Sequence, residues 1–253
     1  MLNKKCLLSI VSIAVLWLPA ALAGENRPSN VLDAVLEISK RIFSHDVDSV
    51  SETPIRGLFE VASGTTVLYI GEEGKFAIEG DIFDLADGNN LTEGKRNRAR
   101  MDAIDGLTGK GMIVFAPDEV RHTITVFTDV DCSYCRKLHN EVSLLKDAGI
   151  AMQYVGFPRA GPSSDTYKKM VSVWCANDRQ KAMTDAKKGK SVPAKQCSHP
   201  LDKYLDIGRK IGVRGTPAIV LEDGTLISGY LPAKRLQDIL EKTFDGHISH
   251  GRQ

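Results

Sequence analysis

Cys132 and Cys135 are the residues of this chain whose type and spacing could most directly do chemistry. They flank Ser133 and Tyr134 and follow the apolar segment 122–129, HTITVFTD. Two cysteines in a CxxC arrangement can close a small disulfide, so they can exchange disulfides with another molecule. We expect the pair to open a helix, whose N-terminal N–H groups and dipole would stabilise a Cys132 thiolate. Cys132 is then the predicted exposed nucleophile and Cys135 the resolving thiol.

Zinc binding and a purely structural bridge are the alternatives for this pair. Zinc needs a full set of protein ligands, and no second CxxC follows. His139 could supply one more ligand, but we expect it to be a surface residue of the helix. A disulfide across two intervening residues closes a loop too short to restrain much of the unfolded chain, so it would add little stability. The sequence also has no flavin or nicotinamide fingerprint. We therefore interpret the pair as redox-active thiols that use no metal and no cofactor.

Two further cysteines have a different context. Cys175 ends an apolar helical stretch, and Cys197 lies in a loop-rich stretch after Pro193. A bridge between them would close a loop worth roughly 3 kcal/mol in the chain-entropy account. We favour a structural role for these two cysteines over a second catalytic pair.

Thr216-Pro217 is the other candidate functional element. It follows 212–215, GVRG, and precedes the strand-like run 218–222, AIVLE. A proline at the entry to a strand is a candidate for a cis peptide bond. An ordinary trans proline in a turn is the alternative, and the local sequence does not separate the two.

The elements expected around these residues alternate between strand and helix. The predicted strands are 112–116, 122–129, 150–157, 218–222 and 225–230, the last two flanking the hairpin signal Asp223-Gly224. The predicted helices are 133–148, 163–177, 199–211 and 232–244. This order favours an α/β sheet with an antiparallel hairpin near its end.

The region before residue 86 predicts a smaller α+β unit. Apolar spacing indicates a helix at 31–43, and a hairpin is expected from 65–70 and 75–80, with a short strand at 81–85. Because so few residues bury only a small core, the unit would gain from pairing with a second copy. Dimerisation is a reasonable expectation for it.

The start of the chain has the order of a secretory signal. Lys4 and Lys5 precede an apolar run at 6–18, and Ala21-Leu22-Ala23 offers a small-residue cleavage site. The run is shorter than the ~20 residues that cross a bilayer. We expect residues 1–23 to be removed on export to an oxidising compartment, where disulfides persist.

The overall charge argues against nucleic-acid binding. The formal net charge is +1, and the one basic cluster, within 95–100, has no interleaved aromatic residues. We interpret 86–110 as a solvated helical linker capped by Thr92 that acts as a hinge between domains. The predicted organisation is a signal peptide at 1–23, an N-terminal domain at 24–85, this linker, and a catalytic domain at 111–253.

Three segments of the chain carry a resemblance to a known family. FTDVDCSYCRKLH, WCANDRQKA…GKSVPAKQC and GVRGTPAIVLEDGTLISGY closely resemble the DsbC/DsbG family of bacterial periplasmic thiol:disulfide interchange proteins. The resemblance implies a thioredoxin-like α/β domain with a helical insertion, plus a small cystatin-like α+β dimerisation domain. It implies that Cys132 attacks and that Cys135 resolves the mixed disulfide.

The family pattern also assigns the remaining candidate residues. It implies a structural bridge between Cys175 and Cys197, and a cis Pro217 that lies with Thr216 beside the nucleophile to position substrate. Ser133 and Tyr134 separate the two thiols, and Ser133 stands where the best-known DsbC members carry glycine and DsbG-like relatives carry proline.

The function implied by the resemblance is disulfide isomerisation in the periplasm. A homodimer would reshuffle wrong disulfides of secreted proteins, with chaperone activity, and a membrane reductase of the DsbD type would keep its thiols reduced. A DsbG-like sulfenic-acid reductase, a dimeric thiol oxidase and a holdase are the alternatives. The reductase would use the same thiols but prefer a sulfenylated substrate, and the oxidase would be isolated with Cys132 and Cys135 oxidised. The holdase would bind unfolded chains without needing Cys132.

Overall fold

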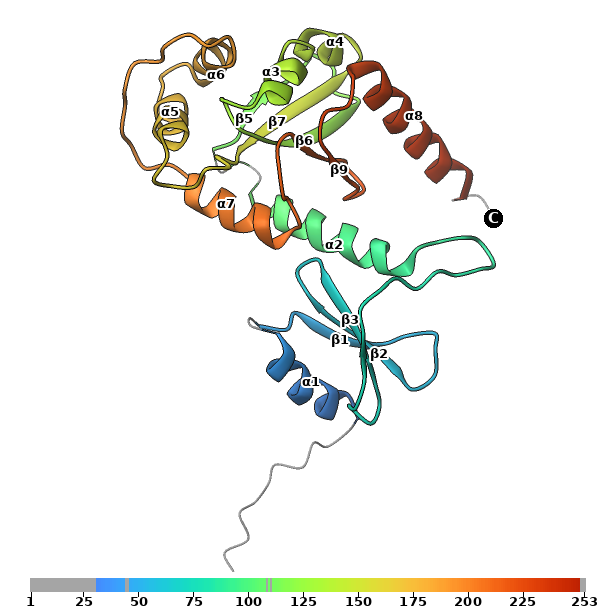
Figure 1. The fold of residues 1–253 in the computed structure, drawn as a ribbon. Coiled ribbons are helices and arrows are strands. Elements are labelled where there is room, and N and C mark those ends of the chain that lie inside the picture. The colour runs from blue at the N-terminus through green and yellow to red at the C-terminus, as the bar shows by residue number, and fades with distance from the viewer. Residues whose placement is uncertain (1–30, 44–45, 108, 110, 251–253) are drawn as a thin grey trace, which may run out of the picture.

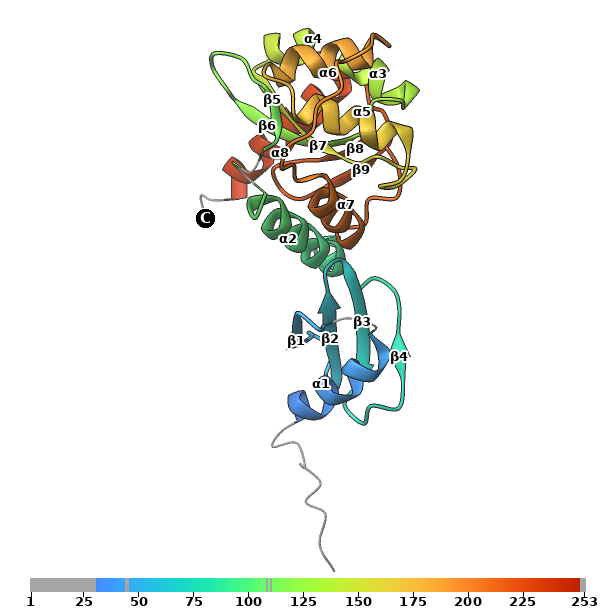
Figure 2. The same cartoon turned by 90° about the vertical axis from the view of Figure 1, so that its left-hand side faces the viewer.

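The structure of this chain is a computed structural model in which two sheets are connected by one long helix (Figure 1). The signal segment expected at 1–23 lies outside the described residues. Helix α2 (Leu91–Asp105) lies between the two sheets in both views (Figure 1 and Figure 2). The described residues are 31–43, 46–107, 109 and 111–250.

The N-terminal part is a four-stranded antiparallel sheet with one helix packed on it. In sheet order its strands are β1 (Ser49–Glu52), β2 (Leu58–Ser63), β3 (Thr66–Gly71) and β4 (Ala77–Ile78). Helix α1 (Val31–Ile42) buries Val35 against Val61 of β2 and Ile70 of β3. Gly64 begins the two-residue turn between β2 and β3 with φ 58°, a conformation that a side chain would oppose.

The sequence predicted this part incompletely. The hairpin of 65–70 and 75–80 is present as β3 and β4, although β4 is only two residues long. The strand expected at 81–85 is wrong, because Phe83 forms only an isolated bridge with Asn90. β1 and β2 were not predicted, because serine and glutamate interrupt their apolar pattern and the pairing with β3 selects them.

Helix α2 contacts both parts of the chain. Thr92 was the expected N-cap, but the cap is Asn90, whose Oδ1 accepts the Glu93 N–H at 2.8 Å. Thr92 is buried and its hydroxyl bonds the Tyr69 hydroxyl in β3. Arg100 is also buried, and it donates to the backbone carbonyl of Ile211.

The basic cluster on α2 was expected to be solvated, but most of it is paired. Arg100 bonds Glu93 at 2.7 Å, and Lys95 reaches Glu60 of β2 at 3.2 Å. Arg96 pairs with Asp81 at 2.8 Å. Lys95 and Arg96 therefore attach the helix to the N-terminal part, while the Arg100–Glu93 pair lies within α2.

The C-terminal part is a five-stranded mixed sheet covered by helices. Its strands, in sheet order, are β5 (Ile113–Phe115), β7 (Ile150–Gly156), β6 (His122–Thr128), β8 (Ala218–Val220) and β9 (Leu226–Ser228). Only β6 and β7 are parallel, and Thr128 at the end of β6 is opposite Gly156. In both views α3, α4 and α6 lie on one side of this sheet, with α7 and α2 on the other (Figure 1 and Figure 2).

The helices of this part differ from the prediction in two places. The stretch 133–148 forms two helices, because the helical conformation is interrupted at Asn140 and Glu141. The break lets Glu141 accept the N–H of Ala233, the first residue of the last helix, at 2.6 Å. The second difference is α6, which the sequence analysis did not predict. The helices are α3 (Ser133–His139), α4 (Val142–Asp147), α5 (Asp165–Trp174), α6 (Arg179–Lys187), α7 (Leu201–Lys210) and α8 (Ala233–His250).

The main hydrophobic core fills the C-terminal part. Trp174 of α5 and Tyr154 of β7 are among its largest fully buried side chains, and the Trp174 indole donates to Gly111 at 3.0 Å. Leu107, just beyond α2, also belongs to this core. Among the residues that the structure describes, no helix has both the length and the apolar character needed to cross a bilayer.

Candidate active site

The CxxC pair lies at the junction between β6 and α3. Cys132 is the N-cap of α3, and its sulfur accepts the Cys135 N–H at 3.4 Å. The Cys132 thiol donates to the backbone carbonyl of Thr216 at 3.2 Å. The expectation of an exposed nucleophile is wrong for this conformation, because Cys132 is only 3% exposed under the Thr216 segment.

The pKa values of the two thiols are shifted in opposite directions. Burial raises the pKa of Cys132, but hydrogen bonds from Thr216 and Cys135 and the positive charge of Arg159 outweigh it, so this pKa is lowered. Burial raises the pKa of Cys135, and here it dominates over the Lys187 charge and the backbone of Asp129. The site therefore favours ionisation of Cys132 over ionisation of Cys135.

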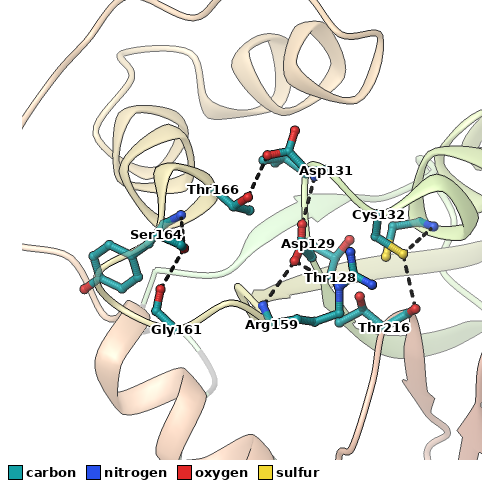
Figure 3. A network of polar contacts seen from close by, with 12 residues as sticks. Thr128, Asp129, Asp131, Cys132, Arg159, Gly161, Ser164, Thr166 and Thr216 are labelled. Carbon is teal, nitrogen blue, oxygen red and sulfur yellow. Dashed lines mark hydrogen bonds and ion pairs between the residues drawn. The ribbon is translucent and has the colours of Figure 1, made fainter.

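A buried aspartate fixes the loop that leads into the pair. Asp129 is 2% exposed, and its Oδ2 accepts both the backbone N–H and the Nε of Arg159 at 3.1 Å (Figure 3). Its Oδ1 accepts the Asp131 N–H at 2.8 Å. Because both carboxylate oxygens are used, Arg159 is held beside the thiols and adds its charge to the site.

A second aspartate connects the same loop to the helical insertion. Asp131 accepts from the Thr166 hydroxyl of α5 at 2.7 Å (Figure 3). It also accepts from Lys169 of the same helix at 3.0 Å. Arg136 of α3 donates to it at 3.2 Å. Burial raises the pKa of Asp131, yet these donors outweigh it and the pKa is lowered. The carboxylate therefore stays charged and ties α5 to the active-site loop.

The segment 216–217 lies directly against Cys132. The peptide bond between Thr216 and Pro217 is cis, and the Pro217 carbonyl accepts the Gly229 N–H at 2.8 Å. The Thr216 hydroxyl is buried, and apart from its interaction with the two thiols it has no polar partner among the described residues. Thr216 and Pro217 thus lie with the thiols, as the family pattern implies.

Ser133 and Tyr134 form the exposed side of the site. Both are exposed, Tyr134 at 60%, and the Tyr134 ring stacks on Tyr230 with centroids 6.4 Å apart. Lys137 lies 4.4 Å from the Tyr230 ring centre. The aromatic pair offers a flat apolar surface next to the otherwise covered sulfur.

His139 was expected on the helix surface, and this expectation is wrong. It is 6% exposed, with one ring nitrogen 2.9 Å from the Tyr154 hydroxyl and the other 3.1 Å from Thr184 Oγ1. Burial and the charges of Lys187 and Lys188 lower its pKa to about 4. The imidazole is therefore a neutral core group that joins α3, β7 and α6.

Cys175 and Cys197 form a disulfide with a Cα–Cα distance of 5.6 Å. Cys175 is the C-cap of α5, and Cys197 lies in the segment before α7. The bridge closes the helical insertion on itself.

Four residues of the site were missed by the sequence analysis: Asp129, Asp131, Arg159 and Lys187. The two aspartates had a usable signal, since they directly precede the CxxC within TDVDC. Arg159 and Lys187 had none, because only the packing of α6 and of the loop after β7 brings them to the thiols.

Comparison with known families assigns both parts of the chain. Residues 27–93 match the model described as the N-terminal domain of disulfide bond isomerase proteins. Residues 110–244 match the model of a thioredoxin-like domain. The C-terminal match explains the mixed sheet with a CxxC at the start of its first flanking helix.

Relatives are similar to this chain over most of its length. The thiol:disulfide interchange protein DsbC of Escherichia coli K12 is 37% identical over 193 residues, which cover 76% of this chain and 80% of the relative. The chain belongs to the DsbC family. DsbC of Dickeya dadantii is 36% identical over 226 residues, covering 88% of this chain and 92% of the relative. The fold class expected from the sequence, a thioredoxin-like domain with a small α+β domain, is confirmed.

A solved structure is similar to about half of this chain. The disulfide interchange protein from Neisseria gonorrhoeae is 31% identical, covers 52% of this chain and 94% of its own, and has a TM-score of 0.48. Membership of the DsbC family makes this chain a thiol:disulfide interchange protein, and its thioredoxin-like part contains the CxxC pair.

Proposed function

We propose that this chain is a periplasmic protein disulfide isomerase that acts through Cys132 and Cys135. The observation that carries the proposal is the opposite pKa shifts of the two thiols of the pair. The lowered pKa of Cys132 makes its thiolate more available for attack, and the raised pKa of Cys135 favours the protonated form of the resolving thiol. A mixed disulfide can then persist long enough for a substrate thiol to attack it.

The proposed reaction begins with attack on a wrong disulfide of a secreted protein. Cys132 thiolate forms a mixed disulfide and releases one substrate thiolate. Another substrate thiolate displaces Cys132, which makes a new substrate disulfide and regenerates the thiolate without net redox change. When this fails, Cys135 attacks Cys132, releases the reduced substrate and leaves the pair oxidised.

Thr216 and Pro217 would position the substrate in this reaction. The Cys132 thiol bonds the Thr216 carbonyl, so a peptide that reaches the sulfur must approach this segment. Tyr134 stacked on Tyr230 adds an exposed apolar contact on the other side. Ser133 and Tyr134 would therefore contact the chain that carries the disulfide.

We propose that the active form is a homodimer joined through the N-terminal part. Its edge strand β4 pairs only with β3 among the described strands. Apolar side chains near this edge are exposed, with Phe76 at 78%, Ile78 at 54% and Leu85 at 93%. A second copy would cover such a surface and place two CxxC sites in one particle.

The proposed location explains why a reducing partner is needed. In the oxidising periplasm the pair would end as a disulfide after each reductive release. We propose export through the segment 1–23 and reduction by a membrane reductase of the DsbD type. No cofactor of its own is required, since electrons enter by exchange at the same two thiols.

Reactivation of a scrambled multi-disulfide protein, such as ribonuclease A, tests the proposal. Purified mature chain in a slow thiol buffer should restore activity at substoichiometric amounts, and Cys132→Ser should not. Cys135→Ser should keep part of the activity, because a substrate thiol can complete the exchange. If Cys132→Ser reactivates as well as the wild type, the proposed mechanism is wrong.

Other outcomes point to the alternative functions. Failure to reactivate, together with rapid reduction of a sulfenylated protein, would favour the DsbG-like reductase. Protection of an unfolded protein from aggregation that is equal in Cys132→Ser and wild type would favour a holdase. Net oxidation of a reduced substrate would favour the thiol oxidase.

A further inference from the structure

Lys187 is a buried cation directly behind the active site. It is the last residue of α6 and is only 3% exposed. Its ammonium group donates to the Thr128 hydroxyl at 2.6 Å and to the backbone carbonyl of Asp129 at 2.8 Å. Both acceptors are neutral, so this charge is held at the end of β6 without a bonded carboxylate.

One backbone carbonyl joins Lys187 to the CxxC pair. The Asp129 carbonyl that accepts from Lys187 at 2.8 Å also accepts the Cys132 N–H at 3.2 Å. Cys135 is only 1% exposed, so little water screens the electrostatic interaction between this thiol and the Lys187 ammonium. The ammonium lowers the pKa of Cys135, and a Cys135 thiolate raises the pKa of Lys187.

Charged and titratable groups from three elements face this amine. The Asp129 carboxylate and both thiols favour the ammonium form, and Arg136 of α3 opposes it. The Tyr154 ring of β7 lies 5.8 Å from Nζ. The charges of Lys187 and Lys188 in turn disfavour a proton on the nearby His139. Burial dominates the balance and lowers the pKa of Lys187 to about 8.

A purely structural role accounts poorly for a lysine at this position. An ammonium bonded only to neutral oxygens inside a core carries a desolvation cost that an apolar side chain of similar size would not. A methionine would fill the same space. Buried residues that cost stability in this way are expected where function requires them.

We propose that Lys187 takes the proton of Cys135 when the enzyme resolves its own mixed disulfide. The neutral amine accepts the thiol proton, which leaves a Cys135 thiolate beside an ammonium group. The thiolate attacks Cys132 Sγ, so the Cys132–Cys135 bond forms and the bond to the substrate breaks. The substrate sulfur leaves as a thiolate and is protonated by solvent, and the ammonium later returns its proton to water.

This step decides how long a mixed disulfide lives. Faster deprotonation of Cys135 favours reductive release, and slower deprotonation gives substrate thiols more time to isomerise. The inference rests on the proposed thiol chemistry but not on isomerase activity, since it concerns a single intramolecular step. Lys187 would thus set the balance between reduction and isomerisation.

Stopped-flow reaction of the reduced protein with 5,5′-dithiobis(2-nitrobenzoate) separates the two thiol steps. Attack by Cys132 releases the first thionitrobenzoate, and attack by Cys135 on the adduct releases the second. Cys135→Ser should lose the second phase, which assigns it. In wild type the second phase should accelerate with pH and level off above about 8, where the amine is neutral.

Lys187→Met should slow the second phase at neutral pH by at least about tenfold, as expected when a general base is lost. Its pH profile should move upward, and the first phase should change by no more than about threefold, because Cys132 is less strongly coupled to this charge. Lys187→Gln, which keeps a donor for Thr128 and Asp129, should behave in the same way. Lys188→Met, at the exposed neighbouring position, is the matched control and should match the wild type.

An unchanged second phase in both Lys187 variants would overturn the proposal. So would a slowed second phase whose pH profile does not move, since this result would indicate altered packing only. Thermal unfolding of each variant checks the fold. Loss of isomerase activity in the wild type would overturn the proposed function but leave this two-phase result intact.

Discussion

At the scale of single residues, the acidity of Cys132 depends on a charge that the loop network holds in place. Arg159 lowers the pKa of this thiol, and the buried Asp129 keeps Arg159 in position with bonds to its Nε and its backbone N–H. The aspartate also removes part of the positive charge. The Arg159 guanidinium is therefore held in a fixed position, and the Asp129 carboxylate neutralises part of its charge.

Replacing Arg159 should weaken the nucleophile at low pH. Because a cation favours the thiolate, Arg159→Gln is expected to raise the pKa of Cys132 and slow its alkylation at about pH 6 by several-fold, with little change at about pH 9. Rates of iodoacetamide modification between these values measure the shift. Arg235→Gln, exposed on α8, is the control. Equal profiles for Arg159→Gln and the control would refute the role given to Arg159.

At the scale of secondary-structure elements, one neutral histidine joins three of them. His139 of α3 contacts Tyr154 of β7 and Thr184 of α6, and its pKa is lowered to about 4. An unfolded chain would take up a proton near pH 6.5, while the folded chain would not. The unfolded state then binds more protons, so stability falls as the pH is lowered.

This linkage predicts a pH-dependent free energy of unfolding. Between about pH 6.5 and about pH 4 the wild type should lose on the order of 2–3 kcal/mol through His139 alone. His139→Gln keeps hydrogen-bonding groups for both partners but does not titrate, so its stability should depend less on pH in this window. Urea unfolding at several pH values gives the difference. Parallel curves for the two proteins would show that the pKa of His139 is the same in the folded and unfolded chains, which would contradict this prediction.

The helical insertion depends on its disulfide. Cys175 and Cys197 are separated by 22 positions, and their bridge restrains the unfolded chain between α5 and α7. Replacing both by alanine should cost about 3 kcal/mol of unfolding free energy in the chain-entropy account. Urea unfolding without reductant measures the cost. Alkylation rates of Cys132 should stay near the wild-type value, and a large loss of reactivity would contradict a purely structural role.

At the scale of the whole molecule, α2 belongs physically to both parts of the chain. It contacts the N-terminal sheet through Thr92 and Lys95, and the catalytic part through the buried Arg100. Leu107 extends the second contact into the main core. We therefore propose that the 86–110 segment transmits the geometry of a dimer to the catalytic part and does not act as a free hinge.

Disrupting the exposed edge of the N-terminal sheet tests the dimer. Phe76 and Ile78 are solvent-exposed in one protomer, so charged replacements should leave the protomer folded. The double variant Phe76→Lys, Ile78→Lys is expected to sediment as a monomer, to keep its two-phase thiol reaction and to isomerise poorly. Analytical ultracentrifugation and the reactivation assay measure both effects. A variant that remains dimeric would exclude this edge as the interface.

The sequence alone determined the chemistry and the class of fold, because both are encoded locally. A CxxC after an apolar strand, and alternating strand and helix patterns, are properties of neighbouring residues. The same reasoning located the candidate pair Cys175 and Cys197 and the proline Pro217. It did not decide whether Pro217 is cis, since that depends on the contacts on both sides of the bond.

Only the tertiary structure decided how the site is tuned. The pKa values of Cys132 and Cys135 depend on Arg159 and Lys187, which lie far from the pair in sequence and reach it through the packing of α6 and the loop after β7. The burial of His139 and Cys132 was mispredicted for the same reason. Exposure and electric field are sums over neighbours in space, and a sequence orders residues only along the chain.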